Sequence, residues 1–206
     1  MRPFWVRAAA LLAGIVLVGI GISNMVAAEL GVAPADVLST GGAEQLGIGV
    51  GTMGWLAGIT YTALAWLLRR PPSWGTVIGG VLVGIAINFG LAVLPETESL
   101  VWRVPMLLGG LAVVYCGISL GVASNLGTGP LELLMLAFGD RGVRVDVARW
   151  GIEAALLAGG LLLGGQIGVG TVLFLVLTGP VLARTLPPVV RFMGTEVLEK
   201  PTGIDA

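Results

Sequence analysis

The sequence predicts an all-α polytopic membrane protein, with about six transmembrane helices in two three-helix inverted repeats. Each repeat also contains a short Pro-initiated half-helix or re-entrant segment. Of the 206 residues, 56% are hydrophobic and 11% are charged, which suits a surface that faces lipid. The chain also matches itself: residues 12–38 agree with 108–134 at 12 of 27 positions, and 47–86 agree with 142–181 at 12 of 40. Chance would give roughly one position in ten, so the sequence indicates a duplicated membrane unit.

Apolar length places the membrane spans, because about 20 helical residues cross the ~30 Å hydrocarbon core of a bilayer. The fifth stretch contains Arg149 and Glu153 and is separated from the sixth by a very short connection, so five spans stay an alternative. The six expected spans cover residues 8–28, 48–68, 74–94, 104–123, 147–164 and 168–186.

The positive charges predict the orientation. With the N-terminus in the cytoplasm, 10 of the 11 basic residues fall on or near the cytoplasmic side, and Arg103 alone falls outside. Both termini are then cytoplasmic, and the second repeat enters the cell membrane from the opposite face, as inverted repeats do. The expected organisation is a first repeat over residues 1–98, a second over 99–190 and a cytoplasmic tail over 191–206.

Between the first and second spans of each repeat lies a segment too short to cross, at residues 31–38 and again at 127–134. Each has a Pro suited to the first helical position, followed two residues later by an acid, Asp36 or Glu132. About 12 helical residues extend ~18 Å, enough to enter the bilayer but not to traverse it. The first copy soon reaches Ser39, Thr40, Gly41 and Gly42, so the alternative for this copy is that it lies on the membrane surface. Inserted half-helices direct free N–H groups towards the midplane, where transporters bind ions and anionic groups.

Several Gly- and Pro-rich motifs of the second half are typical of one known group of proteins. They are GTGPLELL at 127–134, RWGIE at 149–153, GGQIGVGT at 164–171 and TGP at 178–180, with weaker first copies at 31–38 and 75–76. With them the chain resembles the YczE/YyaS/YitT group of bacterial integral membrane proteins, most closely its YczE-like members. Glu132 stands where related sequences usually carry Asp. The resemblance implies a membrane location and a fold, and it implies no substrate.

Arg149 and Glu153 are the first candidates for a functional site. They stand four residues apart on the fifth expected span and therefore face the same way. One interpretation is a structural ion pair near the cytoplasmic interface, and the other is a gate or a proton or cation site; the sequence supports both equally. Glu153 is the better functional candidate because it lies a full turn deeper.

Four further polar residues lie in or beside the expected spans. Asp36 and Glu132 are interpreted first as acids that satisfy the N–H groups of their own half-helices, and second as ligand-binding groups. Asn24 and Asn88 are candidates to line a polar path, although hydrogen bonding between helices explains them equally well.

The composition excludes several classes of function. Histidine is absent and Cys116 is the only cysteine, so metal sites, disulfides and His-based catalysis are not expected, and neither is an enzyme or a cofactor. The net charge of −1 and the lack of a basic tract argue against nucleic acid. We therefore expect a small secondary transporter or permease-like protein for a small molecule or ion. The alternative is a non-transporting membrane protein that stabilises or regulates a partner, and a homo-oligomer stays open.

Overall fold

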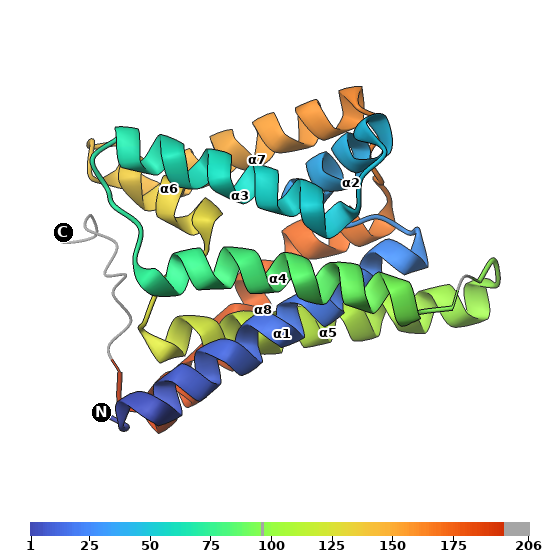
Figure 1. The fold of residues 1–206 in the computed structure, drawn as a ribbon. Helices are drawn as coiled ribbons and strands as arrows, with labels where there is room; N and C mark the ends of the chain where they lie inside the picture. Colours follow the sequence, from blue (N-terminus) through green and yellow to red (C-terminus); the bar gives the residue numbers. More distant parts are fainter. Residues whose placement is uncertain (96, 196–206) are drawn as a thin grey trace.

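The computed structural model describes residues 1–95 and 97–195, and its regular structure there is entirely helical (Figure 1). The all-α class is therefore confirmed. Six helices overlap the six expected spans, and α2 and α6 coincide with the expected half-helices. Of the expected tail, residues 191–193 belong to the last helix, 194 and 195 follow it, and 196–206 lie outside the described residues. The helices are α1 (Phe4–Ala28), α2 (Pro34–Leu46), α3 (Val50–Leu67), α4 (Trp74–Val93), α5 (Leu100–Ser124), α6 (Pro130–Gly139), α7 (Val145–Leu162) and α8 (Val169–Met193).

Length and composition alone give fewer spans than the sequence predicts. Within the described residues, α1, α4, α5 and α8 are each long and apolar enough to cross a membrane, and α2 with α3 forms a fifth candidate bent by 116°. Helix α7 is not among them, and it carries three charged residues, Asp146, Arg149 and Glu153. The protein is thus a polytopic membrane protein with four or five candidate spans.

Helices α1 and α5 form the central pair of the fold and run antiparallel (Figure 1). Glycines allow their backbones to approach closely at two points. A Cβ atom placed on Gly14 would lie 2.7 Å from the Gly117 carbonyl oxygen, and one placed on Gly21 would lie 2.7 Å from that of Gly110. No larger residue fits at these positions without separating the helices.

The half-helices α2 and α6 begin in the middle of the molecule and run towards opposite ends (Figure 1). Pro130, the first residue of α6, contacts α3 and α4: Cβ atoms placed on Gly58 and Gly80 would lie 3.6 and 3.3 Å from its ring. Helix α2 packs against α3 and α7. Its polar stretch at residues 39–42 is buried rather than placed on a membrane surface. Its hydroxyls bond their own helix, with Ser39 Oγ donating to Ala35 O and Thr40 Oγ1 donating to Val37 O, each at 3.1 Å.

The segment before each half-helix packs against the start of a long helix from the other half of the chain. Gly31 has a φ of +103°, and a Cβ atom there would meet the Gly168 nitrogen at 2.5 Å, so glycine is required on both counts. The Gly170 N–H donates to the Leu30 carbonyl oxygen at 2.8 Å. At the other end of the molecule, a Cβ atom on Gly127 would lie 2.7 Å from Ser73 Oγ.

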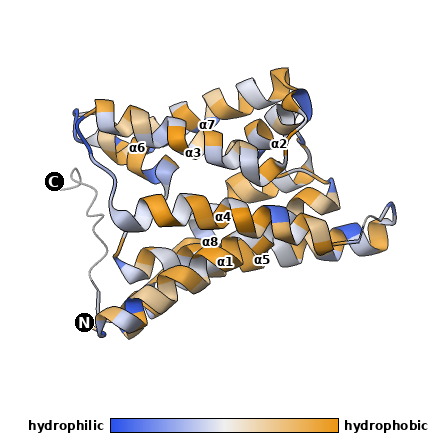
Figure 2. Cartoon of the chain, viewed as in Figure 1, coloured by the Kyte–Doolittle hydropathy of each residue, from blue (hydrophilic) through white to orange (hydrophobic). Residues whose placement is uncertain are grey.

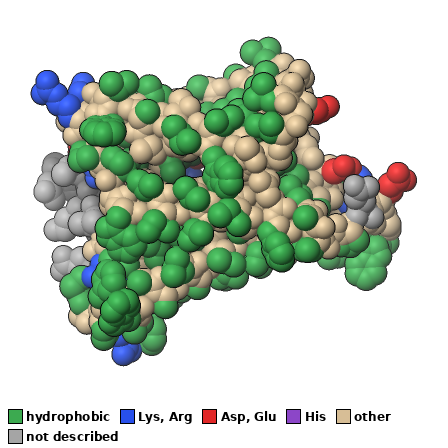
Figure 3. All heavy atoms as spheres, in the orientation of Figure 1, with side chains coloured by type: hydrophobic (Ala, Val, Ile, Leu, Met, Phe, Trp, Pro, Cys, Tyr) green, Lys and Arg blue, Asp and Glu red, His purple; other side chains and the backbone are tan. Residues whose placement is uncertain are grey.

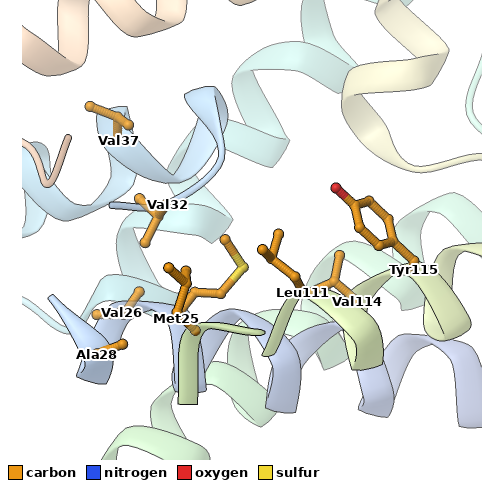
Figure 4. Close-up of a cluster of buried hydrophobic side chains, with 9 residues drawn as sticks. Met25, Val26, Ala28, Val32, Val37, Leu111, Val114 and Tyr115 are labelled. Atoms are coloured by element: carbon orange, nitrogen blue, oxygen red, sulfur yellow. The ribbon is translucent and has the colours of Figure 1, made fainter. Parts of the chain in front are cut away.

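Three apolar clusters lie among the described residues, the smallest of them formed by Ala10, Ala123 and Met193. The largest one joins α1, the α1–α2 connection, α2 and α5 and includes Met25, Val32, Leu111 and Tyr115 (Figure 4). The second, which we call the α3–α6 cluster, consists of Ala57, Tyr61, Ala65, Leu133, Leu134, Ala137 and Leu156, the last of these from α7.

The surface suits a protein surrounded by lipid. Helix α4 exposes Val77, Val81, Ile85 and Phe89, an apolar stripe at helical spacing. Polar residues are concentrated towards the two ends of the molecule (Figure 2). Lys and Arg gather at the end that holds the N-terminus, and Asp and Glu gather at the opposite end (Figure 3).

Candidate functional site

Arg149 and Glu153 form an ion pair on α7. Arg149 Nε donates to Glu153 Oε1 at 2.9 Å, and the two side chains are 43% and 12% exposed. The expectation that they face the same way is confirmed. The pair therefore neutralises itself.

Asn88 joins two helices of the first half. Its Oδ1 accepts a hydrogen bond from the Gly51 N–H at 2.8 Å, and its Nδ2 donates to Thr52 Oγ1 at 3.1 Å. Gly51 belongs to the first turn of α3, where backbone N–H groups have no partner within the helix. The Asn88 side chain thus replaces a missing cap on α3, which gives it a structural role.

Asn24 bonds near its own position in the chain, and the Glu132 side chain lies near its own. Asn24 Nδ2 donates to the Ile20 carbonyl oxygen at 2.8 Å, one turn earlier on α1. Glu132 turns back so that its Oε2 lies against Gly129, the residue that precedes α6. This position matches the expected capping role of a Glu at the third helical residue.

Asp36 occupies the corresponding position on α2 without making a corresponding bond. Among the described residues, no hydrogen bond or ion pair engages its carboxylate. The positive end of a helix dipole stabilises a nearby carboxylate by about 0.3–1 kcal/mol. At Asp36, no bond to the backbone of the described residues at the start of α2 accompanies this interaction with the helix dipole. The capping interpretation thus holds better for Glu132 than for Asp36.

Tyr61 is a functional candidate that the sequence reasoning missed. It lies in the α3–α6 cluster with 9% of its surface exposed, and its hydroxyl oxygen is buried without a hydrogen-bond partner. Ala35 and Leu38 of α2 pack against the same cluster. The sequence did contain an indication of Tyr61, because this residue stands within an apolar expected span, where a buried hydroxyl needs a hydrogen-bond partner.

An open pocket lies where the α2–α3 turn approaches the α7–α8 turn, with a volume of ≈ 400 Å³. Beside it, the Gln166 N–H donates to Thr40 Oγ1 at 3.0 Å, while Gln166 Oε1 is buried without a partner. The predicted site residues do not line it. The lining consists of Thr40, Ala43, Glu44, Gly47, Ile48, Val50, Gly164 and Gln166.

The structure therefore does not bring all the predicted site residues together into one site. It brings Arg149 to Glu153, while Asn24 and Asn88 serve the helices that they contact. The arrangement offers acid groups and free helix N-termini inside an apolar protein. These groups can bind a proton, a cation or an anionic group.

Comparisons with known proteins agree with this picture. The uncharacterized membrane protein YczE of Bacillus subtilis (strain 168) is 27% identical over 197 residues, covering 94% of this chain and 92% of that protein. An uncharacterized protein of Haemophilus influenzae (strain ATCC 51907 / DSM 11121 / KW20 / Rd) is 29% identical over 182 residues, covering 88% of this chain and 84% of that protein. No solved structure matches the chain.

The resemblance to YczE-like proteins is thereby confirmed. The profile of a family described as "Family of unknown function (DUF6198)" matches residues 5–186, which is most of the chain. The chain therefore belongs to the DUF6198 family, and it is similar to a membrane protein along nearly its whole length.

Proposed function

We propose that this protein is a small secondary transporter, permease-like, that works by alternating access between two inverted halves in the cytoplasmic membrane. The observation that carries the proposal is the pair of half-helices, α2 and α6, which begin in the middle of the molecule and run to opposite ends (Figure 1). In transporters, such discontinuous helices direct free N–H groups and positive dipole ends at a ligand near the midplane. The substrate is a small molecule or an ion.

The glycine contacts between α1 and α5 support the inverted arrangement. In the repeated sequence, Gly14 corresponds to Gly110 and Gly21 corresponds to Gly117. Gly14 contacts Gly117, and Gly21 contacts Gly110. Replacing each glycine of one contact by its repeat equivalent therefore gives the other contact. Because the two helices are antiparallel, a rotation that exchanges them has its axis perpendicular to both. An axis of this kind relates the halves of an inverted repeat.

The ends of the same two helices follow the same correspondence. Arg7 Nη2 donates to the Asn125 carbonyl oxygen at 2.6 Å, and Arg103 forms an ion pair with Glu29. At the spacing of the first repeat, Arg7 corresponds to Arg103 and Glu29 to Asn125. Each end of the central pair is therefore closed by an arginine that reaches the end of the other helix.

We propose six spans, formed by α1, α3, α4, α5, α7 and α8, with residues 1–98 as the first half and 99–190 as the second. Pairing of Arg149 with Glu153 reduces the cost of placing α7 in lipid, which supports counting it as a span. The end of the molecule rich in Lys and Arg holds the N-terminus and is assigned to the cytoplasm (Figure 3). We also propose that the protein is not an enzyme, since its polar groups suit binding rather than nucleophilic catalysis.

The proposal is tested by restraining one half against the other in reconstituted protein. Leu38 on α2 lies against Gly159 on α7, where a Cβ atom would meet Leu38 Cδ1 at 3.4 Å. In a Cys116→Ala background, Leu38→Cys and Gly159→Cys can be joined by a short, cleavable bifunctional thiol reagent. In proteoliposomes screened against a metabolite panel under proton and sodium gradients, the reagent should stop uptake of the transported solute, and cleavage should restore it.

The two single-cysteine variants serve as controls and should keep their uptake in the presence of the reagent. Equal uptake by the linked and unlinked double variant would contradict alternating access between the halves. Failure to move any solute of the panel, or any proton or sodium ion, would count against transport itself.

The second candidate function is a non-transporting protein that stabilises or regulates a membrane partner. It is favoured by the close glycine contacts along α1 and α5, which pack the centre tightly, and by an ion pair that is satisfied on its own helix. Under this function, the linked double variant should bind its partner as well as the unlinked protein does.

A further inference from the structure

The open pocket of ≈ 400 Å³ lies between two turns that are far apart in the sequence. One wall comes from residues 40–50, at the end of α2 and the start of α3, and the other from residues 164–166, between α7 and α8. Both turns lie at the end of the molecule opposite the N-terminus (Figure 1). Sites for small organic molecules have volumes of roughly 300–1,000 Å³, so the pocket is large enough for a small ligand.

Hydrogen bonds hold the two walls of the pocket together. The Gln166 N–H donates to Thr40 Oγ1 at 3.0 Å, which joins the α7–α8 turn to α2. Gln45 Nε2 donates to the Leu163 carbonyl oxygen at 3.2 Å, which joins the same two parts of the chain a second time. The pocket is therefore formed before a ligand arrives, and such pre-formed sites are usual for small molecules.

Two glycines of the lining leave space in the pocket. Gly47 has a φ of +65° and Gly164 a φ of +81°, so each turn favours glycine through its backbone. A Cβ atom at either position would meet nothing within 4 Å. The turns thus close the ends of α2 and α7 without placing a side chain in the opening.

The carboxylate of Glu44 is the charged group of the pocket lining. It is exposed, and among the described residues no ion pair engages it. Neither wall supplies a base, because residues 30–68 and 150–183 contain no Lys or Arg. The pocket also lies at the end of the molecule where Asp and Glu gather (Figure 3). Its charge therefore favours a positively charged ligand.

Gln166 adds a hydrogen-bond acceptor to the same lining. Its Oε1 is buried and has no partner among the described residues, although the residue itself lines the pocket. Buried polar atoms almost always have a partner, so this oxygen is short of a donor. A turn of the terminal amide can bring Oε1 to the open space, where a ligand N–H can donate to it. Glu44 attracts any cation, whereas this oxygen selects a cation that carries a donor.

The rest of the lining narrows the class of cation. A bound metal ion needs several oxygen ligands, and within the described residues no three His, Cys, Asp or Glu side chains come together to hold one. A quaternary ammonium ion carries no N–H and is typically held by aromatic side chains, which this lining lacks. Ala43, Ile48 and Val50 offer short aliphatic surfaces instead, which suit a short carbon chain.

We infer that the pocket binds a small primary or secondary alkylammonium ion, which places its charge at Glu44 and donates an N–H to Gln166 Oε1. Under the proposed orientation, the pocket opens on the outer face of the membrane. An ion of this class is then the solute that the transporter takes up. This role as an entry site rests on the proposed function, whereas the binding itself does not.

Binding is tested in purified full-length protein in detergent, with n-propylammonium chloride as the probe. A ligand that binds only the folded state raises the melting temperature, and propylammonium should do so saturably. Tetramethylammonium chloride and sodium chloride at equal concentration should not. Glu44→Gln should weaken propylammonium binding about tenfold or more, because it removes a charge-assisted hydrogen bond. Glu98→Gln, which removes an exposed acid outside the pocket, should leave the binding unchanged.

A second variant tests the amide. Gln166→Met keeps the length of the side chain and the backbone N–H that bonds Thr40, but it removes the acceptor. It should weaken propylammonium binding and reduce the preference over tetramethylammonium. Equal stabilisation by the three salts would overturn the inference, and so would propylammonium binding that stays at full strength in Glu44→Gln or in Gln166→Met.

The headgroup of phosphatidylethanolamine carries the same primary ammonium as a free amine, and nanodiscs distinguish the two sources. In phosphatidylcholine nanodiscs, propylammonium should bind as it does in detergent. Weaker binding after addition of phosphatidylethanolamine would assign the ammonium site to the lipid headgroup and remove its role in uptake. Unchanged binding would assign the site to a free amine.

The pocket and the transport function fail separately. If propylammonium binds as described and no amine moves in proteoliposomes, the binding site stands and transport of its ligand falls. If a solute is transported and its uptake survives Glu44→Gln, the transporter stands and the pocket is not its entry site.

Discussion

At the scale of single residues, the polar side chains of this protein divide by where their partners stand in the sequence. Arg149 finds Glu153 one turn away, so spacing alone predicts the pair. Asn88 bonds Gly51, which is 37 residues earlier in the chain. Sequence spacing carries no information on a contact of that kind, so the cap on α3 could not be foreseen.

The ion pair on α7 gives a prediction about stability. Glu153→Gln should strand the Arg149 cation and lower the free energy of unfolding by about 1–2 kcal/mol, less than for a fully buried pair because Arg149 is 43% exposed. The double change Arg149→Met with Glu153→Leu should restore the melting temperature, since both charges are then gone. A double variant less stable than Glu153→Gln would show that the pair does more than neutralise itself.

The amide of Asn88 gives a second prediction with a matched control. Asn88→Ala removes both hydrogen bonds to the start of α3 and should destabilise the protein by about 1–2 kcal/mol. Asn24→Ala removes a single bond within α1 and should cost less. Thermal unfolding of the two variants in the same detergent compares them directly, and an equal loss would contradict the capping role.

At the scale of elements, apolar length and Pro position predicted the helices well, because both act within a few turns of chain. The expected half-helices begin as α2 and α6 do, at Pro34 and Pro130. Burial of α2 was not predicted, because Ser39 and Thr40 suggested a wet surface. Their hydroxyls bond carbonyl oxygens of the same helix, which removes the cost of placing them inside. The surroundings of Tyr61 depend on how α3 meets α6 and α7, which sequence spacing does not show.

The crossing of α1 and α5 predicts opposite results at neighbouring glycines. A Cβ atom at Gly110 would lie 2.8 Å from the Gly21 carbonyl oxygen, whereas nothing lies within 4 Å of one at Gly109. Gly110→Ala should therefore destabilise the protein by about 1–3 kcal/mol. Gly109→Ala should be neutral, or stabilising by up to about 1 kcal/mol, because Ala favours a helix. Melting temperatures check both, and equal effects would mean that the helices are not in close contact.

At the scale of the whole molecule, the composition fixed the membrane class, and the internal match indicated two related halves. The number of spans did not follow as directly, because α7 carries charges whose cost depends on their pairing. Orientation depends on the charges at the two ends, which Figure 3 shows to be of opposite kinds.

The proposed orientation predicts which loops an impermeant reagent reaches. In a Cys116→Ala background, Glu98→Cys lies between α4 and α5 and should react with a membrane-impermeant maleimide added to intact cells. Val143→Cys lies between α6 and α7 and should react only after the membrane is opened; both native side chains are exposed. The reverse pattern, or outside labelling at both positions, would contradict cytoplasmic termini and six spans.

The paired glycine contacts of α1 and α5 also bear on the origin of the chain. Under the proposed symmetry, the two halves contact each other through equivalent surfaces. Two separate copies of one half, inserted in opposite orientations, would contact each other in the same way. An ancestral half of about one hundred residues could thus have assembled as a homodimer of two orientations in one membrane. Under this proposal, fusion of two such subunits would have fixed one orientation for each copy. Aligned positions at which the two copies differ, such as Gly19 and Tyr115, would then reflect the separate specialisation of the two copies after fusion.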